Sequence, residues 1–500
     1  MEATYNMPID ELKEKGSDFV LDQEFLGEIE RTQESDKYDS KSEKEIKRKF
    51  DLYLLPIFSL VYLAMSIDRA SIGNANIEGL GEDLQLEGYD LNLALTAFFI
   101  CYGAIEIPSN MVIKKFPPRY WLSLSTVLFG LVSMCTAFVK NYGGLVATRI
   151  FLGFFEGGMQ PGITFALSMF YKRSELQVRV GFFIASAALA GAFGGLLAMG
   201  LSAIPTHGPV KKWGWIFLLE GIMTMIIGIC AFFILPDSPK SAKFLAYDQR
   251  EAAHNRVEVE LRHSKDEKIN RTQLVLGFKS LHSWLCGLAF YLTGLVVQST
   301  SLFLPTLLKG MGYTSSRAQL MSVPPFAAGC FFVVVSSYAS DYFGVRGPFN
   351  AFYFLLCVIG YVLLYTEDRL GVRYFATFLI CMGGFSLGPG VLTWSSNNAA
   401  SHTTRAVATA IVAIVGTLGS ITAMWIYLPK YAPSYDEGHK ILIGTCSGGV
   451  VLCLGMSTYL FYENKARDEG KRNGLTAKFA TDEEAKSMLA HRHPSFRYLI

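Results

Sequence analysis

Charged side chains are scarce in this 500-residue chain. Asp, Glu, Lys and Arg make up 18% of the residues, whereas soluble proteins carry about 25%. Hydrophobic residues make up 51% and aromatic residues 13%. This balance favours a protein that crosses a membrane several times over a soluble globular protein. The formal net charge is only +2, so no excess of positive charge indicates a nucleic-acid partner.

Sequence signatures of metal, redox and nucleotide chemistry are also missing. The nine cysteines form no Cys-x-x-Cys pair; they lie in or beside apolar stretches, as small residues packed between helices do. No His/Cys cluster suggests a metal, and no Walker-type glycine loop suggests ATP hydrolysis. A membrane enzyme would need a His-Asp or Cys-His constellation within a span, and none is seen. We therefore expect a protein that is not an enzyme and uses no cofactor or metal.

Long apolar stretches are what the sequence has instead. A bilayer core of about 30 Å needs roughly 20 apolar residues as a helix. Twelve stretches meet this need, and they lie near residues 51–75, 91–113, 120–139, 143–171, 178–202, 213–235, 281–305, 318–340, 349–366, 372–396, 405–428 and 441–463. The sequence predicts an all-α membrane protein with twelve transmembrane helices in two pseudo-symmetric six-helix halves.

The longest polar interruption, near 236–280, divides the spans six and six. Its middle, "SAKFLAYDQREAAHNRVEVEL", has helical spacing and is predicted to form an amphipathic helix along the membrane surface. The predicted parts are a disordered N-terminal tail 1–49, a six-helix half 50–235, the central loop 236–280, a second half 281–463 and a C-terminal tail 464–500. Pro-Gly steps at matching places in spans 4 and 10 indicate a weak internal repeat, as in many secondary transporters.

Basic residues in short loops predict the orientation. "KRKF" precedes span 1, "KKFPPR" follows span 2 and "YKRSELQVR" follows span 4, whereas the loop after span 1 has no Lys or Arg. Lys211 and Lys212 on the other side weaken this bias without reversing it. We expect both termini and the central loop to be cytoplasmic.

Five ionisable residues lie inside the predicted spans: Asp68 and Arg69 in span 1, Glu106 in span 2, and Arg149 and Glu156 in span 4. Each costs at least about 2.5–3.5 kcal/mol at the bilayer centre, so such residues face the protein interior or a wet cavity. Arg149 and Glu156 are seven residues apart, on one helix face. Because spans 1 and 4 run in opposite directions, Asp68 can meet Arg149 while Glu156 lies deeper.

Charge counting suggests what this cluster does. Asp68, Glu156, Arg69 and Arg149 sum to zero, so a monoanionic solute makes the site −1, which is costly in a low dielectric. A solute that pairs with an Arg frees a carboxylate to take up a proton, and that proton restores neutrality. This interpretation makes Asp68 and Glu156 proton-coupling groups, with Arg69 and Arg149 binding substrate. The alternative is a fixed ion-pair network that only holds two helices together.

Other polar residues in or beside the spans are softer candidates for substrate binding. Tyr102, one turn before Glu106, is either a hydrogen-bonding partner or a packing aromatic. Gln298 in span 7, and Asn397 and Asn398 at the end of span 10, are either ligands or interhelical hydrogen-bond partners. Glu106 lies nearer the cytoplasmic end of span 2, where bonding to backbone groups is the alternative to a functional role, so both interpretations stay open.

Structural and gating roles are expected for a further set. Gly153 and Gly157 are four residues apart, a spacing that lets helices approach closely. Pro161 should bend span 4, because it removes a backbone donor and its ring clashes with the preceding turn. The loops after spans 2 and 8 add Lys114, Arg119, Asp341 and Arg346.

Several stretches together resemble a known family. They are "DRASIGNANIEGL", "EIPSNMVIKKFPPRYW", "AFVKNYGGLVATRIFLGFFEGGMQPG", "YKRSE", "GAFGGLLAMG", "WIFLLEGIMT" with "LPDSP", "FLPTLLKGMGYTSSRAQLMSVPP" and "YLPKYAPSYDEGH". The chain resembles the major facilitator superfamily and, within it, the fungal allantoate permease branch of anion:cation symporters. That branch includes carriers of allantoate, nicotinate, biotin and pantothenate.

The resemblance implies two six-helix halves around a central cavity and uptake of small organic anions with protons. In the related sugar-acid and sialic-acid carriers, an Asp-Arg pair in helix 1 matches Asp68 and Arg69. An Arg and a Glu seven apart in helix 4 match Arg149 and Glu156, and a Tyr in helix 2 matches Tyr102. The carboxylates there are linked to proton coupling, and the helix 1 Arg and the Tyr to substrate.

The chain also departs from these relatives. Lys114 stands where the superfamily loop has an Asp, although the second copy keeps Asp341. Glu106 stands where sugar-acid carriers tend to have Gln. The tail "HRHPSFRYLI" resembles the ends of nicotinate-type members. We therefore expect a proton-coupled symporter importing a small organic anion such as nicotinate or allantoate, acting as a monomer in the plasma-membrane lipid bilayer. A drug/proton antiporter of the same fold and a non-transporting nutrient sensor are the alternatives.

Overall fold

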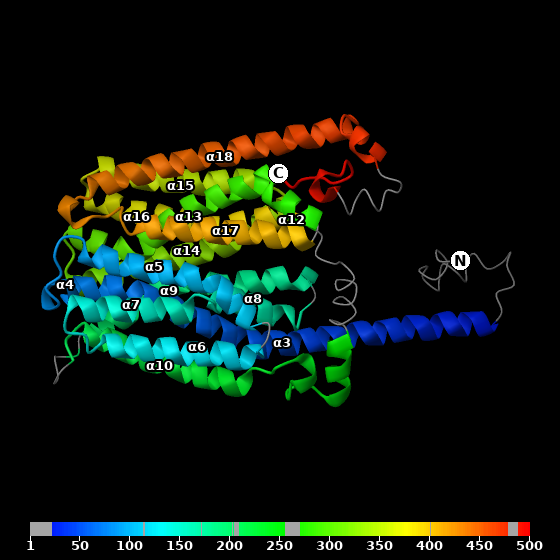
Figure 1. The fold of residues 1–500 in the computed structure, drawn as a ribbon, viewed down its shortest axis with the longest axis horizontal. Coiled ribbons are helices and arrows are strands. Elements are labelled where there is room, and N and C mark those ends of the chain that lie inside the picture. Colours follow the sequence, from blue (N-terminus) through cyan, green and yellow to red (C-terminus); the bar gives the residue numbers. More distant parts are fainter. Residues whose placement is uncertain are drawn as a thin grey trace.

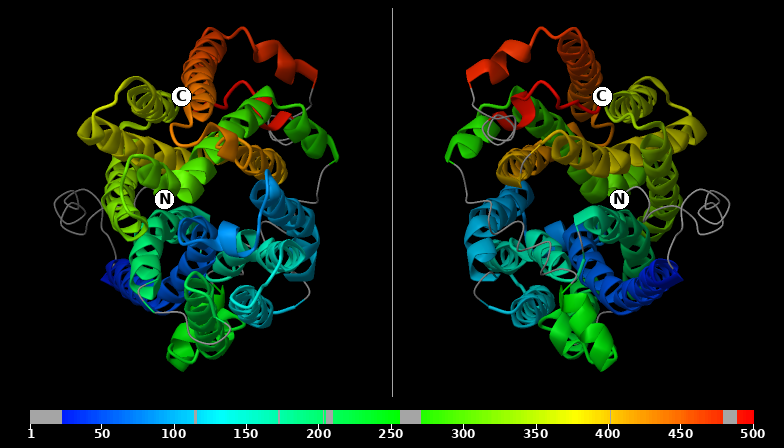
Figure 2. Two further views of the ribbon diagram at one scale, coloured as in Figure 1. Left: turned by 90° about the vertical axis from the view of Figure 1, so that its left-hand side faces the viewer. Right: turned by 90° about the vertical axis from the view of Figure 1, so that its right-hand side faces the viewer.

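A computed structural model describes residues 23–500, apart from gaps at 114–115, 172, 203, 205–209, 256–270, 401 and 479–488. Long helices lie side by side along one direction (Figure 1). Seen end-on in Figure 2, they form two groups, one from the first half of the chain and one from the second.

The first group comprises α3 (Gln23–Ile77), the short α4 (Leu80–Asp83), α5 (Asp90–Ile113), α6 (Pro118–Thr136), α7 (Tyr142–Glu156), α8 (Met159–Ser168), α9 (Arg173–Ser202) and α10 (Gly214–Ile234). The second group comprises α13 (Leu281–Gly310), α14 (Ser315–Phe343), α15 (Gly347–Thr366), α16 (Leu370–Asn397), α17 (His402–Ala423) and α18 (Asp436–Asp468), preceded by α12 (Arg271–Phe278). Short 3₁₀ turns lie at Pro239–Ser241, Pro429–Tyr431, Asn473–Lys478 and Ala490–Arg492.

Each of the twelve predicted spans corresponds to helical chain. Among the described residues, nine helices are long and apolar enough to cross a membrane by length and composition. The spans outside that set correspond to α5, α6 and the α7–α8 pair, which lie within the bundle, α5 against α7 and α6 against α10. The predicted all-α membrane fold in two halves is confirmed.

Span 4 is broken into two helices, α7 and α8. The break falls at Gly157 and Gly158, and Pro161 is the third residue of α8. Proline lacks the backbone N–H that would bond the preceding turn, so the interruption lies one turn before it, as the sequence predicts. The break comes directly after Glu156.

Glycines bring α7 close to α5. A Cβ at Gly153 would lie 2.4 Å from the carbonyl oxygen of Phe98, and one at Gly157 would lie 2.5 Å from that of Tyr102. Real Cβ atoms do not approach so closely, so only glycine allows this spacing. The predicted close helix approach is therefore present, and it places Tyr102 beside span 4.

Helix α3 differs from the prediction at its N-terminus. It begins at Gln23, so residues 23–49 are helical in the structure, whereas the sequence suggested a disordered tail up to residue 49. No proline interrupts the chain between Gln23 and Pro56, and Glu45 pairs with Lys49 one turn later at 2.9 Å. Such i,i+4 pairs extend helices. Residues 1–22 lie outside the described part of the chain.

The central loop packs on α3. Lys49 donates a 2.9 Å hydrogen bond to Gln249, and the rings of Tyr53 and Phe244 stack at 4.5 Å. Residues 247–255 are helical, inside the stretch predicted as an amphipathic helix. The rest of that prediction, from residue 256, lies outside the described residues.

Several hydrogen bonds join the two halves at the end of the bundle where α3 ends. The Ile77 carbonyl oxygen accepts from Lys309 Nζ (3.1 Å) and from Ser315 Oγ (2.9 Å). The Met424 carbonyl oxygen accepts from Asn92 Nδ2. Between side chains, Gln319 donates to Glu78 (3.2 Å) and Trp425 donates to Thr96 (3.0 Å). The structure is therefore a conformation in which the halves are closed together at this end.

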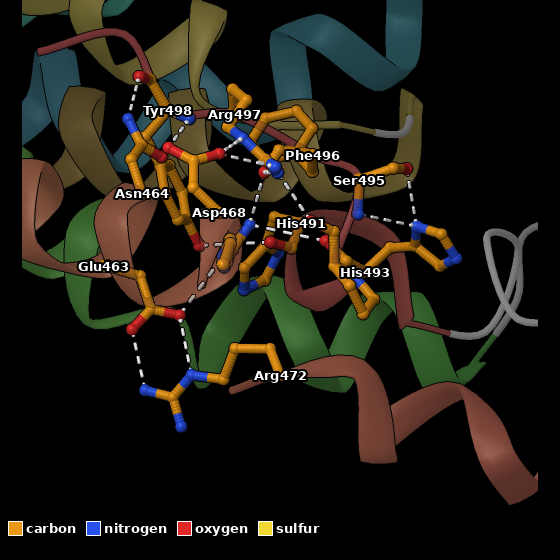
Figure 3. A network of polar contacts seen from close by, with 12 residues as sticks. Glu463, Asn464, Asp468, Arg472, His491, His493, Ser495, Phe496, Arg497 and Tyr498 are labelled. Carbon is orange, nitrogen blue, oxygen red and sulfur yellow. Dashed lines mark hydrogen bonds and ion pairs between the residues drawn. The ribbon is translucent and has the colours of Figure 1, made fainter. Parts of the chain in front are cut away.

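The C-terminal segment, residues 489–500, docks against the opposite end of the second half. Asn464 exchanges two hydrogen bonds with the backbone of Tyr498, and Arg467 donates to the carbonyl oxygen of Phe496 (2.8 Å). Figure 3 shows these contacts together with the Arg497–Asp468 ion pair. The last two residues of the chain reach α16 and the α14–α15 loop through Leu499 and Ile500.

This docking should depend on pH through His491. Burial, assisted by the charges of Arg492 and Arg467, lowers the pKa of His491 to about 4, from about 6.5 in an unfolded chain. The docked segment holds the imidazole neutral, whereas an undocked segment takes up a proton below about pH 6.5. We therefore expect docking to be strongest above pH 6.5 and to weaken as the pH falls towards 4, by at most about tenfold per pH unit for one proton.

The pH dependence of docking can be measured by hydrogen exchange of residues 489–500 in the purified protein, corrected for intrinsic exchange rates. Protection should be full at pH 7.5 and reduced at pH 5. His491→Gln should flatten the profile between these values. An equal loss of protection in wild type and variant would show that another group controls undocking.

Candidate functional site

A cavity of about 130 Å³ lies between the two halves of the bundle. Its polar lining comes from both halves: Arg69 and Ser66 on α3, Arg149 on α7, and Gln298 and Ser301 on α13. Aromatic and apolar side chains complete it. Of the predicted site residues, Arg69, Arg149 and Gln298 thus share one cavity.

Arg69 pairs with Glu156 across α3 and α7. Arg69 Nε donates to Glu156 Oε2 at 2.7 Å, and the Glu156 side chain is fully buried. The guanidinium group also lies over the ring of Tyr102, 4.5 Å from its centre. The charge of Arg69 is therefore shared between a buried carboxylate behind it and the cavity in front, and Tyr102 fixes its position.

Asp68 lies close enough to Arg149 for their charges to interact, but it makes its hydrogen bond to another helix. Its Oδ1 accepts a hydrogen bond from Ser133 on α6, and no ion pair within 4 Å joins it to Arg149 in the part of the chain that the structure describes. Adjacent helical residues project about 100° apart. With Arg69 turned to Glu156 and the cavity, Asp68 is turned to α6 instead.

Arg149 borders the cavity and forms no ion pair within 4 Å with any residue that the structure describes. It is 2% exposed, and its guanidinium group lies 5.4 Å from the ring centre of Phe217. Its Nε and Nη2 atoms make no hydrogen bond within the described residues. A buried guanidinium with free donors is costly unless another group satisfies it.

Glu220 on α10 belongs to the same cluster and was missed from the sequence. It is 3% exposed and contacts Ser71, which lies one turn along α3 from Asp68. Its Oε1 has no partner, and no cation of the described chain pairs with it. The rule that singled out Asp68 and Glu156, an ionisable residue inside an apolar stretch, also applies to "WIFLLEGIMT" and would have found it.

The contacts of Ser71 indicate whether the carboxyl group of Glu220 carries a proton. Its Oγ lies within hydrogen-bonding distance of both the Ile67 carbonyl oxygen (2.9 Å) and Glu220 Oε2. A hydroxyl group has one hydrogen, so both bonds form only if the Glu220 carboxyl group carries a hydrogen and donates it to Ser71. With Glu220 included, three carboxyl groups stand against two guanidinium groups, and one proton balances the cluster.

If Glu220 is protonated, Glu220→Gln should leave the stability of the fold nearly unchanged. A glutamine amide is nearly isosteric with a protonated carboxyl group and can donate to Ser71 in the same way. We expect the free energy of unfolding to change by less than about 1 kcal/mol, whereas Glu220→Ala leaves a cavity and should cost about 2 kcal/mol or more. Thermal unfolding of the purified variants checks this. Equal losses in both variants would mean that the ionised carboxylate is needed.

Glu106 does not line the cavity, although it lies close enough to Arg69 for their charges to interact. It lies on α5 one turn beyond Tyr102, is half-buried, and has no ion pair or hydrogen bond to the described residues. Lys114 lies outside the described residues. Across the same part of the chain, no group of three or more His, Cys, Asp or Glu side chains is placed to hold a metal ion.

Asn397 and Asn398 are not in the cavity, contrary to the sequence-based expectation that they bind substrate. They stand at the end of α16, where Asn398 Oδ1 accepts from Leu499 N (2.7 Å) and its Nδ2 donates to Leu499 O (2.9 Å). This amide holds the C-terminal segment. The expectation failed because the partner is a backbone segment 101 residues away in the sequence.

The loop residues predicted for structural roles make local contacts. Arg119 donates to the Phe232 carbonyl oxygen (2.6 Å) and lies 3.9 Å from Asp237, which joins the start of α6 to the end of α10. Asp341 and Arg346 form an ion pair across the α14–α15 turn. These contacts tie neighbouring helices together at the end of the bundle where the C-terminal segment docks.

Comparison with known proteins places this arrangement in a family. The Major Facilitator Superfamily profile matches residues 58–424. An uncharacterised transporter of Schizosaccharomyces pombe is 35% identical over 86% of this chain and 89% of its own length. The major facilitator-type transporter hxnP of Emericella nidulans is 33% identical over 92% of this chain and 94% of its own.

Solved structures agree on the fold. The proton:xylose symporter XylE superposes with a TM-score of 0.64 at 17% identity, covering 82% of this chain and 96% of XylE. A bacterial homologue of the human lysosomal transporter Spinster, in an inward-facing conformation, superposes with a TM-score of 0.61 at 14% identity, covering 81% and 96%. The chain is a multi-pass membrane transporter and not an enzyme, and it belongs to the Major Facilitator Superfamily.

Proposed function

We propose that this protein imports a small organic anion together with a proton. The observation that carries the proposal is Arg149, a buried guanidinium group beside the cavity whose Nε and Nη2 have no hydrogen-bond partner among the described residues. A carboxylate entering the cavity would satisfy these donors, with charge-assisted hydrogen bonds that planar guanidinium groups form well. Gln298 and Ser301 on α13 would contribute neutral hydrogen bonds from the second half.

The Arg69–Glu156 pair supports the proposed proton coupling. A carboxylate that draws Arg69 towards the cavity weakens its 2.7 Å bond to Glu156. A fully buried carboxylate without its counter-ion is costly, so Glu156 then takes up a proton. Substrate and proton thus offset one another's charge. Asp68 and Glu220 do not line the cavity, but they belong to the same buried cluster and supply further carboxyl groups over which a proton can be shared.

The substrate class proposed is a small monocarboxylate or ureide anion such as nicotinate or allantoate. The cavity of about 130 Å³ is smaller than the roughly 300–1,000 Å³ of typical drug-sized sites, which supports a small solute over the bulkier substrates of a drug antiporter. The allantoate-permease resemblance points in the same direction. We place the protein in the plasma membrane as a monomer, with both termini and the central loop cytoplasmic.

Uptake into proteoliposomes under an imposed pH gradient tests the proposal. Labelled nicotinate should accumulate when the outside is acidic, and unlabelled nicotinate, allantoate, biotin and pantothenate should compete according to fit. Accumulation that does not respond to the pH gradient would overturn proton coupling. Export driven by the opposite gradient would favour the antiporter, and saturable binding without flux would favour a sensor.

A further inference from the structure

A second cavity, of about 330 Å³, lies at the end of the bundle where α18 ends. Its walls are the first turn of α13, the last turns of α18 and the docked C-terminal segment. Figure 3 shows this region, with Glu463 and Arg472 on one side and His491 and Tyr498 of the C-terminal segment on the other. It is separate from the central cavity and shares no lining residue with it.

The lining has a strong excess of positive charge. Four cationic side chains line it, Lys279, Arg467, Arg472 and Arg492, against one carboxylate, Glu463. That carboxylate is already satisfied, because it accepts from Arg472 Nη2 at 2.7 Å and from Arg467 Nε at 3.2 Å. Lys279 and Arg492 pair with no carboxylate of the described chain. Their charges are available to an anion.

A buried histidine borders this cavity with one ring nitrogen unpartnered among the described residues. Asn398 is fixed with its Nδ2 as donor, because its Oδ1 accepts from Leu499 N. His282 Nε2 lies 3.2 Å from this Nδ2 and 3.4 Å from the Trp394 carbonyl oxygen, so Nε2 accepts from the first or donates to the second according to the tautomer. His282 is 6% exposed and lines the cavity, and its Nδ1 has no partner among the described residues.

The start of α13 contributes in the same direction. Ser280, Leu281 and His282 belong to its first turn and line the cavity. The first N–H groups of a helix lack internal partners, and the dipole of this 30-residue helix places partial positive charge there. Helix N-termini with nearby basic side chains are typical sites for phosphate oxygens.

We propose that this cavity binds a phosphate group, with the headgroup of an anionic phospholipid as its source. Aromatic side chains beside it are exposed, as is typical at the headgroup level of a membrane: Trp284 (48%), Tyr459 (47%) and Tyr462 (64%). Basic pockets between transmembrane helices bind anionic headgroups. Because His491, Arg492 and Tyr498 complete the cavity, the bound headgroup also holds the C-terminal segment in place.

The full-length purified protein, stripped of lipid, tests this by native mass spectrometry and thermal unfolding. The probes are phosphatidylinositol, phosphatidylcholine, and the soluble glycerophosphoinositol and inorganic phosphate. The variant Lys279→Gln/Arg492→Gln removes two charges from the cavity. The matched control Lys240→Gln/Lys243→Gln removes two exposed charges from the loop after α10, which also lies at the α18 end of the bundle.

We expect phosphatidylinositol to be retained and to raise the unfolding temperature of wild type and control, and phosphatidylcholine to do neither. The cavity variant should bind phosphatidylinositol at least tenfold more weakly. If glycerophosphoinositol or phosphate stabilises the protein but no lipid is retained, the cavity binds phosphate and the proposal that a phospholipid supplies it is wrong. Equal binding in the cavity variant and the control would overturn the site.

Discussion

Glu156→Gln should abolish accumulation of substrate against its gradient. A pH gradient of one unit supplies about 1.4 kcal/mol per proton, enough for about a tenfold accumulation of a monoanion moved with one proton. Glutamine keeps the shape of the side chain and a hydrogen bond to Arg69. It cannot take up the proton that Glu156 binds when substrate draws Arg69 away. The accumulation ratio should therefore fall from about ten to about one.

Proteoliposome uptake with the inside held one pH unit more alkaline measures this ratio. Exchange of labelled for unlabelled substrate at equal pH should persist in the variant, because exchange needs binding and movement of the halves but no net proton transfer. Glu437→Gln, which removes an exposed carboxylate at the start of α18, should behave as wild type. Tenfold accumulation by Glu156→Gln would assign coupling to another carboxyl group.

Arg69→Ala should remove both stability and transport. The substitution leaves Glu156 fully buried without the guanidinium group that pairs with it at 2.7 Å. Removing one partner of a buried ion pair costs about 3–5 kcal/mol. It also removes one of the two cations that border the cavity, so substrate affinity should fall at least tenfold.

A double variant separates these two effects. Arg69→Ala/Glu156→Gln removes the stranded charge and should regain most of the lost stability, while uptake stays absent. Thermal unfolding followed by tryptophan fluorescence, alongside uptake, gives both readouts. Lys440→Ala, which breaks the exposed Lys440–Glu437 pair, should cost about 0–1 kcal/mol. Stability of Arg69→Ala equal to that of this control would show that the buried pair contributes little.

The sequence predicted positions along the helices well and directions around them poorly. Length and hydropathy locate a span because the bilayer demands about 20 apolar residues, and all twelve spans lie in helical chain. The small-residue spacing of Gly153 and Gly157 likewise predicted a close helix approach. Which way Asp68 and Arg69 face depends on packing against three other helices, so the Asp68–Ser133 hydrogen bond and the Arg69–Glu156 pair were found only in the structure.

The other differences between the predicted and the observed site come from contacts that leave no pattern in the neighbouring sequence. Asn398 bonds to the backbone of Leu499, and backbone acceptors are the same whatever the residue. Glu220 was within reach of the rule for intramembrane charges, but its meaning depends on Ser71, 149 residues earlier in the chain. Polar groups inside spans are thus visible in a sequence, whereas their partners are not.

The bonds that close the bundle at the α3 end have a consequence for the transport cycle. Five hydrogen bonds there link the halves, and each contributes about 0.5–1.5 kcal/mol net. A carrier that is closed at the α3 end must break these bonds before it can open there, so this opening step, and not the binding of solute, should limit turnover when solute is plentiful. Weakening these bonds should then speed turnover while lowering the fraction of the carrier that is closed at the α3 end.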